Sequence, residues 1–239
     1  MDCDTYRTAP PPPPPPPAPL PRGRGGFPPE APRDCPLCPR LVTYRETVAA
    51  REPDWFNGAV PSFGSETARL LVVGLAPGVT GANRTGRPFT GDWAGDLLYA
   101  TLEKFGFSSG TYEASPDDGL KLKDAMITNA VRCVPPENKP VGTEINACRP
   151  FLQSRIAALP DLKVLLCLGK ISHDSTVRTL GLKLSAHPFG HNTRYDVEFE
   201  GRPLTLLSSY HCSRYNTNTK RLTPEMFEDV FAVAKQLVD

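Results

Sequence analysis

The sequence predicts an α/β protein, a three-layer α/β/α sandwich with a central, mostly parallel sheet. Three short, strongly apolar runs are expected as buried strands, at 70–73, 124–131 and 163–168, and a helix-favouring segment follows each of them. Strands that alternate with helices form a parallel sheet covered on both faces. The chain has 239 residues and a hydrophobic content of 39%, which is enough for one such domain.

Capping and turn signals predict the remaining elements. Thr143 is expected to cap a helix that carries Glu144 in its first turn. Thr223 followed by Pro224 opens the last helix. The expected order is a helix at 40–51, strand 70–73, helix 93–107, strand 124–131, helix 143–159, strand 163–168, helix 169–180, strands 193–199 and 203–208, and a helix from 223.

The N-terminal segment differs in composition from the rest. It contains an unbroken proline run from Pro10 to Pro17, and then Arg22 and Arg24 among glycines. Such a segment cannot bury a core, so residues 1–30 are expected to be a disordered Pro-rich tail and 31–239 a single domain. The tail is read as a spacer, with a proline-binding partner or a phosphate contact as alternatives.

Composition limits the compartment and the partners. No segment approaches the roughly 20 apolar residues of a membrane span, and no signal-peptide pattern precedes the proline run. The expectation is an intracellular, cytoplasmic protein, in which the seven cysteines are thiols or metal ligands rather than disulfides. A net charge of +1 means that any anionic ligand must meet a local patch of positive charge.

A glycine-rich loop at 74–92 follows the strand at 70–73 and leads into the helix at 93–107. This is where α/β proteins place ligands, and arginines, Phe89 and Asp92 share the loop with the glycines. The mixture suits a flat, polar ligand attached to phosphate, although an ordinary surface loop would also contain such glycines. The pattern fits neither the Rossmann glycine motif nor the P-loop, so a nucleotide-handling enzyme is disfavoured.

Polar residues also follow the other parallel strands. They lie in the segments 129–138, 169–170 and 209–213. Since parallel strands end at the same edge of a sheet, these loops and Asp92 are expected to converge.

Four cysteines are candidate metal ligands. Cys35 and Cys38 are spaced as C-x2-C, and Cys133 and Cys148 form a wider pair. Four thiolates can hold a tetrahedral zinc or an iron–sulfur cluster, and four unconnected cysteines remain an alternative. Cys3, in the tail, and Cys167, in an apolar strand, are not expected to be ligands.

Several separated motifs resemble the iron–sulfur uracil-DNA glycosylases, and among them family 5, the type B enzymes. The first is the loop at 74–92, the second is His211-Cys212-Ser213 with the segment 216–223 behind it, and the third is the segment 131–140. The four cysteines fall where that family binds its cluster. The resemblance covers the chain from about residue 32 and implies a uracil-DNA glycosylase-like fold, a [4Fe–4S] cluster and a monofunctional DNA repair glycosylase.

The resemblance also implies roles for individual residues. Asp92, His211 and Asn138 would be catalytic: His211 donates to the departing base, and Asp92 orients water or stabilises the cationic sugar. Phe89 would stack on the base and Asn129 would read its edge. The full set of implied base and DNA contacts is Gly74, Ala76, Gly78, Asn83, Arg84, Arg87, Phe89, Asn129, Ser213 and Arg214, and Lys220 and Arg221 are further candidates for phosphate contacts.

Four of these residues also have simpler interpretations. Asp92 would equally cap the helix at Trp93, Phe89 would be core, and Asn129 would bond neighbouring backbone. His211 would be a structural histidine.

The sequence departs from the family pattern at two positions. Cys212 replaces the usual proline, which would have stiffened the second motif. Ala76 stands where related families carry a carboxylate or an amide that holds water. The main expectation is hydrolytic removal of uracil and other deaminated bases from DNA, as in base excision repair, and the alternative is a DNA-damage binding module with little catalysis. The partner would be uracil-containing DNA and no membrane, and the protein would be a monomer associated with the nucleoid.

Overall fold

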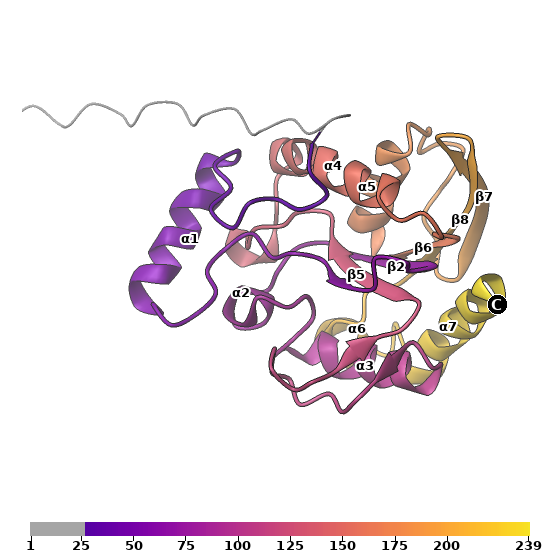
Figure 1. Cartoon of the computed structure of the whole chain (residues 1–239), viewed down its shortest axis with the longest axis horizontal. Helices are drawn as coiled ribbons and strands as arrows, with labels where there is room; N and C mark the ends of the chain where they lie inside the picture. Colours follow the sequence, from indigo (N-terminus) through magenta and orange to yellow (C-terminus); the bar gives the residue numbers. More distant parts are fainter. Residues whose placement is uncertain (1–26) are drawn as a thin grey trace, which may run out of the picture.

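The computed structural model describes residues 27–239 and has a six-stranded central sheet (Figure 1). The strand order is β1-β5-β2-β6-β8-β7, and β5, β2, β6 and β8 run parallel, with antiparallel strands at both edges. The mostly parallel sheet is therefore confirmed. The strands are β1 (Phe63–Gly64), β2 (Leu70–Gly74), β5 (Ala125–Asn129), β6 (Val164–Leu168), β7 (Thr193–Phe199) and β8 (Arg202–Ser209), and β3 (Ser108–Ser109) pairs separately with β4 (Lys121–Leu122).

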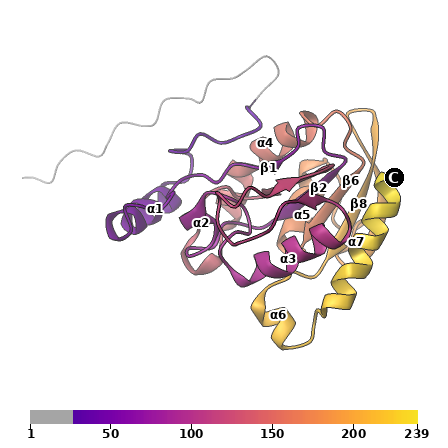
Figure 2. The same cartoon turned by 60° about the horizontal axis from the view of Figure 1, so that its bottom comes forward.

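Helices cover both faces of the sheet. In Figure 2, α3 and α7 lie together on one side of the strands and α4 on the other. The alternation of β2 side chains explains both contacts, because Leu70 and Val72 join the core under α3 and α7, whereas Leu71 and Val73 join the core under α4 and α5. The three layers are thus confirmed. The helices are α1 (Pro39–Arg51), α2 (Ala82–Thr85), α3 (Trp93–Lys104), α4 (Gly142–Ala157), α5 (Lys170–Thr179), α6 (Arg214–Asn218) and α7 (Pro224–Val238), and a 3-10 turn spans Pro136–Asn138.

Two helix boundaries differ from the prediction. The N-cap of α4 is Val141 rather than Thr143. The Glu144 carboxylate accepts a hydrogen bond from the Val141 amide at 2.8 Å, so an acidic side chain within the helix satisfies the exposed backbone donor. Helix α3 stops at Lys104, and Gly106 follows with a left-handed φ of 74°.

The folded domain includes residues that were predicted to lie in the tail. Phe27 packs edge-on against Phe151, with ring centroids 5.3 Å apart. Glu30 forms ion pairs with Arg132 and Arg155 at 3.0 and 2.6 Å. Residues 27–30 therefore belong to the domain, and the predictions for the proline run and for Arg22 and Arg24 fall outside the described residues.

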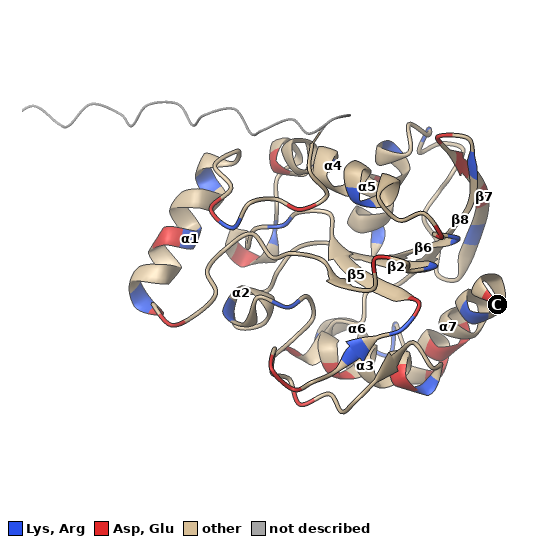
Figure 3. Cartoon of the chain, in the orientation of Figure 1, with Lys and Arg blue, Asp and Glu red and all other residues tan. Residues whose placement is uncertain are grey.

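Between residues 27 and 239, no helix is both long and apolar enough to cross a membrane. Positive and negative side chains are mixed along helices such as α1 and α7 (Figure 3). A positive surface for an anionic ligand must therefore come from particular loops rather than from a whole side of the domain.

Candidate active site

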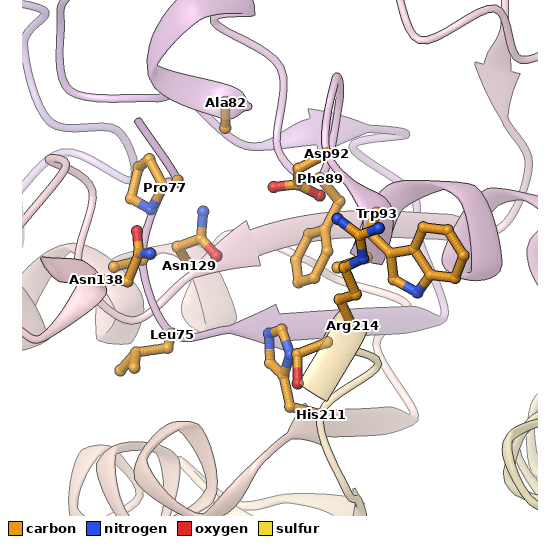
Figure 4. A pocket seen from close by; sticks show the side chains of 14 residues that line it. Leu75, Pro77, Ala82, Phe89, Asp92, Trp93, Asn129, Asn138, His211 and Arg214 are labelled. Carbon is orange, nitrogen blue, oxygen red and sulfur yellow. The ribbon is translucent and has the colours of Figure 1, made fainter. Parts of the chain in front are cut away.

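A cavity of about 350 Å³ lies at the carboxyl edge of the parallel strands. In Figure 4, Phe89, Asp92 and Arg214 gather on one side of it, Asn129 and Asn138 on the other, and His211 below them. The predicted convergence is confirmed for the loops after β2, β5 and β8, and the loop after β6 contributes by contact with His211. The lining residues are Leu75, Ala76, Pro77, Gly78, Ala82, Phe89, Asp92, Trp93, Ala94, Asn129, Asn138, His211, Ser213 and Arg214.

Phe89 belongs both to the core and to the cavity wall. It is 7% exposed, and its ring is roughly parallel to the imidazole of His211, with centroids 5.9 Å apart. Its backbone adopts a left-handed φ of 54°, which is unusual for a residue other than glycine. Phe89 is therefore a core residue, as its simpler interpretation predicted, and its buried ring also has one side toward the cavity.

Asn129 ends β5 and turns its amide toward the cavity. Its Oδ1 atom is buried and has no hydrogen-bond partner among the described residues. Gly74 is its neighbour on β2, and a Cβ atom there would collide with Asn129 Oδ1 and with the ring of Phe89. Glycine at position 74 is thus what allows the amide and the aromatic ring to approach each other, and a buried amide oxygen without a partner is available to a ligand.

Asp92 is the N-cap of α3, as its simpler interpretation predicted. Its Oδ1 atom accepts a hydrogen bond from the Gly95 amide at 3.1 Å. The carboxyl group also lines the cavity, where its Oδ2 atom lies against the backbone at Gly78 and Gly81. Burial raises the pKa of Asp92 above its usual value. Capping therefore uses one oxygen and leaves the carboxyl group at the cavity wall.

His211 follows β8 and is held from several sides. The Asn216 side chain donates to the His211 carbonyl at 2.8 Å, and a Cβ atom at Gly169 would lie 3.3 Å from His211 Cβ. Withdrawal from water lowers the pKa of His211 to about 4, so the imidazole is neutral at physiological pH.

Cys212 turns away from the cavity into the core. It is completely buried, and its thiol donates to the Ala94 carbonyl of α3 at 3.5 Å. Ser213 caps α6 by accepting from the Asn216 amide at 3.4 Å. The packing of Cys212 and the capping by Ser213 therefore hold the second motif in place, although the proline that the family usually has is absent.

Two predicted DNA contacts do not face the cavity. Arg87 is 4% exposed, and its guanidinium makes two hydrogen bonds of 2.7 Å to the Asp118 carboxylate. Asn83 is fully buried, and its amide donates to Asn57 Oδ1 at 3.0 Å. Both side chains lie inside the domain rather than in the cavity lining: Arg87 is fully paired, whereas Asn83 Oδ1 has no hydrogen-bond partner among the described residues.

Of the other predicted cations, Arg214 lines the cavity. Arg84 is exposed, with its Nε atom bonded to the Thr80 carbonyl at 2.9 Å, and Lys220 is also exposed. The Arg214 guanidinium lies 5.4 Å from the ring centre of Trp93, and the Arg221 guanidinium lies 4.7 Å from that of Tyr210. Aromatic rings thus orient Arg214, at the cavity, and Arg221.

The prediction missed the large exposed apolar residues, of which Trp93 lines the cavity. In the described chain the large exposed hydrophobic side chains are Trp93, Val141, Ile171 and Tyr215. They lie on segments that follow β2, β5, β6 and β8, at the carboxyl edge. The available signal was their position after the predicted parallel strands.

The four candidate cysteine ligands come together from distant segments. Cys35, Cys38, Cys133 and Cys148 line one small cavity beside α1. Two N–H groups point at the sulfurs, from Arg45 to Cys133 at 3.3 Å and from the Arg132 amide to Cys148 at 3.2 Å. Burial and mutual repulsion raise the pKa of Cys38 to about 12, and bound cations would relieve this penalty on the thiolates.

The chemistry of the donor set bears on the kind of metal centre. Within residues 27–239, no three metal-binding side chains are close enough to hold one ion. Four thiolates suit a tetrahedral zinc or an iron–sulfur cluster, so the all-thiol donor set fits the predicted cluster and also the zinc alternative. Cys167 is completely buried in β6, as expected of a core residue, and Cys3 lies outside the described residues.

The fold and the site define an α/β protein whose cavity is lined by an aromatic ring, an amide and a neutral imidazole. The chain belongs to the uracil DNA glycosylase superfamily, whose family model matches residues 61–235. This confirms the predicted resemblance, and the relatives place the chain with the type 5 enzymes.

The relatives resemble this chain over most of its length. The type-5 uracil-DNA glycosylase of Thermus thermophilus is 47% identical over 209 residues, which are 85% of this chain and 93% of that protein. The type-5 enzyme of Pyrobaculum aerophilum is 37% identical, over 82% of this chain and 86% of that protein. A type-4 enzyme from Sulfurisphaera tokodaii is 29% identical over 74% of this chain and 76% of its own length.

Proposed function

We propose that this chain removes uracil and other deaminated bases from DNA by hydrolysing the N-glycosidic bond, leaving an abasic site for base excision repair. The observation that carries the proposal is the buried, unpartnered Oδ1 atom of Asn129 beside the Phe89 ring. Membership of the glycosylase superfamily and the names of the type-5 relatives support it.

The substrate base must leave the DNA stack to reach this cavity. Extrusion of a nucleotide costs a few kcal/mol, and less for a mispaired or damaged base. The Phe89 ring offers a stacking face, and the Asn129 amide offers both a donor and an acceptor to the base edge. A base that hydrogen-bonds to these buried groups binds more tightly than one that leaves them without partners.

The chemistry follows from the charges that develop as the C–N bond breaks. The electron pair of that bond leaves with the base, which becomes an anion, while the sugar becomes a cation that a water molecule captures. The neutral imidazole of His211 donates an N–H hydrogen bond to the base anion. Asp92 faces the cationic sugar or orients the water, whose released proton balances the reaction.

Ala76 cannot hold the water. Its methyl group lines the cavity without a polar atom, so water must be positioned by Asp92 or by backbone groups. Asn138 is a second candidate, since it lines the same cavity on a turn with a left-handed φ of 57°.

Phosphates on either side of the extruded nucleotide would meet the rim. Arg84, Arg214, Lys220 and Arg221 supply charge, and the backbone around Gly78 supplies amide donors. This interface is local, which agrees with a chain of nearly balanced charge.

The four cysteines are proposed to bind a [4Fe–4S] cluster. A bound cluster would supply positive charge to buried thiolates, and this chain's residues would hold it from the N-terminal segment, the loop after β5 and α4. The N–H groups of Arg45 and Arg132 would stabilise the ligated sulfurs. A monomer working in the cytoplasm at the nucleoid is the proposed setting.

The test is incubation of the purified, cluster-replete protein with a duplex that carries one uracil, followed by an assay for abasic sites. Formation of abasic sites under single-turnover conditions is expected, with matched thymine duplex as the control. Tight binding of the uracil duplex without base release, tested also with hypoxanthine and xanthine, would favour the binding-module alternative and reject the glycosylase.

A further inference from the structure

We propose that Tyr112 and Asp118 are positioning residues that hold the base-stacking ring of Phe89. Both lie on the segment between β3 and β4, which does not line the cavity. The inference rests on the proposed function, because it assigns Phe89 to the extruded base, and it adds a device that sets the position of that ring.

Phe89 needs external support because its backbone is unfavourable. Its φ of 54° places a bulky residue in the left-handed region. Such conformations persist where surrounding contacts over-determine them, and they concentrate at ligand sites. The contacts around Phe89 should therefore show what keeps it there.

Tyrosine hydroxyl groups hold the backbone on both sides of this strained residue. The Tyr112 hydroxyl donates to the Phe89 carbonyl at 3.3 Å and accepts from the Gly91 amide at 3.4 Å. The Tyr99 hydroxyl donates to the Pro88 carbonyl at 2.8 Å. The two tyrosine rings stack with centroids 4.4 Å apart, so the hydroxyls are fixed relative to each other.

Helix α3 closes the remaining space. A Cβ atom at Gly95 would overlap the Phe89 carbonyl and come within 2.6 Å of the Tyr112 hydroxyl. The same glycine amide donates to the capping carboxylate of Asp92. One turn of α3 therefore contacts both the ring-bearing loop and its hydroxyl support, with no room for a side chain between them.

Asp118 fixes the segment that carries Tyr112. Its carboxylate accepts hydrogen bonds from both terminal nitrogens of Arg87, at 2.7 Å. It also accepts from the backbone amides of Glu113 and Leu120, at 3.1 and 3.0 Å. The Arg87 Nε atom donates to Thr90 Oγ1 at 2.7 Å. The ion pair thus bridges the segment and the residues flanking Phe89, and Arg87 hydrogen bonding holds the pKa of Asp118 well below its usual value.

This connection explains why Arg87 is buried rather than exposed to DNA. Its guanidinium lies 5.3 and 5.7 Å from the ring centres of Tyr99 and Tyr112, the two tyrosines that hold the loop backbone. An arginine in the glycine-rich loop therefore acts on the base site through the loop that presents Phe89.

The experiment compares Tyr112→Phe with Tyr195→Phe in the holoenzyme. Tyr195 is a matched control, because its hydroxyl also donates to a backbone carbonyl, that of Pro188 at 2.7 Å, outside the cavity lining. Single-turnover uracil release should fall about 10-fold in Tyr112→Phe, because a shifted Phe89 ring misplaces the base relative to the groups that act on it. DNA affinity should be unchanged. Tyr195→Phe should keep the wild-type rate.

A double-mutant cycle with Phe89→Ala separates positioning from general stability. If Tyr112 acts through the ring, Tyr112→Phe should cause no further loss in the Phe89→Ala background. Equal losses in both backgrounds, or a wild-type rate for Tyr112→Phe, would overturn the inference.

If the wild-type protein releases no base from any lesion, the proposed function fails separately. A crystal structure of Tyr112→Phe then decides the inference. A shifted Phe89 backbone supports it, and an unchanged left-handed Phe89 overturns it.

Discussion

His211 works as a neutral donor at the residue scale, and its removal should affect chemistry rather than binding. A preorganised donor to a developing anion contributes about 3–4 kcal/mol, so His211→Ala should lower single-turnover release by about 10²–10³-fold. Affinity for uracil-containing DNA should stay within a few-fold of wild type. His187→Ala is the matched control, because His187 bonds a backbone carbonyl at 3.0 Å and does not line the cavity. Parallel loss of binding and turnover would make His211 a binding residue.

The pH profile should report Asp92 rather than His211. His211 has a pKa lowered to about 4, so it stays neutral as the pH falls from 8 to 5. Asp92 has a raised pKa, so its carboxylate is lost at a higher pH than that of an ordinary aspartate. We expect the release rate to be flat near neutrality and to fall on the acid side.

The variant Asp92→Asn tests this assignment. It should lower the rate at neutral pH and abolish the acid limb, measured as single-turnover rate against pH. An acid limb that persists in Asp92→Asn, or that disappears in His211→Ala, would contradict the assignment.

Residue types and motif spacing predicted most of the cavity lining but not which charged groups are satisfied inside the domain. Asn129 could be placed because it ends a parallel strand, and Phe89 and His211 because they follow strands that end at the same edge. Arg87 could not, because its partner Asp118 lies 31 positions away in an irregular segment. Local pattern shows that a charge is present, whereas tertiary pairing decides whether it faces solvent.

At the scale of elements, loss of one partner of the ion pair between Arg87 and Asp118 should destabilise the domain strongly. Both side chains are nearly or fully buried, so Asp118→Asn leaves an uncompensated guanidinium inside the domain. Loss of one partner of a buried pair costs about 3–5 kcal/mol. Asp124→Asn is the control, because its pair with Arg69 is partly exposed and should contribute at most about 1 kcal/mol. Urea unfolding of the holo protein measures both, and similar midpoints for the two variants would show that the buried pair contributes no more than an exposed one.

Long elements were predicted well and short ones were not. The runs that became β2 and β6 are apolar throughout, and Thr223 with Pro224 gave a capping signal that the structure bears out in α7. The strands β1, β3 and β4 have two residues each, too few for any alternation to be visible. Such elements exist because tertiary neighbours pair with them, as β1 pairs with β5.

At the scale of the whole molecule, α1 stands beside the sheet rather than on one of its layers (Figure 1). It is connected to the rest by a small buried apolar cluster that contains Leu41, by the ion pair of Arg40 with Glu144 at 2.7 Å and by the four-cysteine site. The apolar cluster is small and Arg40 is exposed, so the proposed iron–sulfur cluster should be the main attachment of this part of the chain. Residues flanking Cys35 and Cys38 should therefore depend on the cluster, while the sheet should not.

Hydrogen exchange on the holo protein and on Cys38→Ser tests this division. In Cys38→Ser, iron should be lost and amide protection should fall in residues 27–60 and 130–148. The amides of β2, β6 and β8 should remain protected, because they bond within the sheet and not to the N-terminal segment. Cys167→Ala is the control: this cysteine is buried in β6 away from the site and should keep wild-type iron and N-terminal protection. Full iron content with unchanged exchange in Cys38→Ser would exclude the cluster as the attachment. A wild-type protein that contains zinc and no iron would show that the four cysteines bind zinc instead of a cluster.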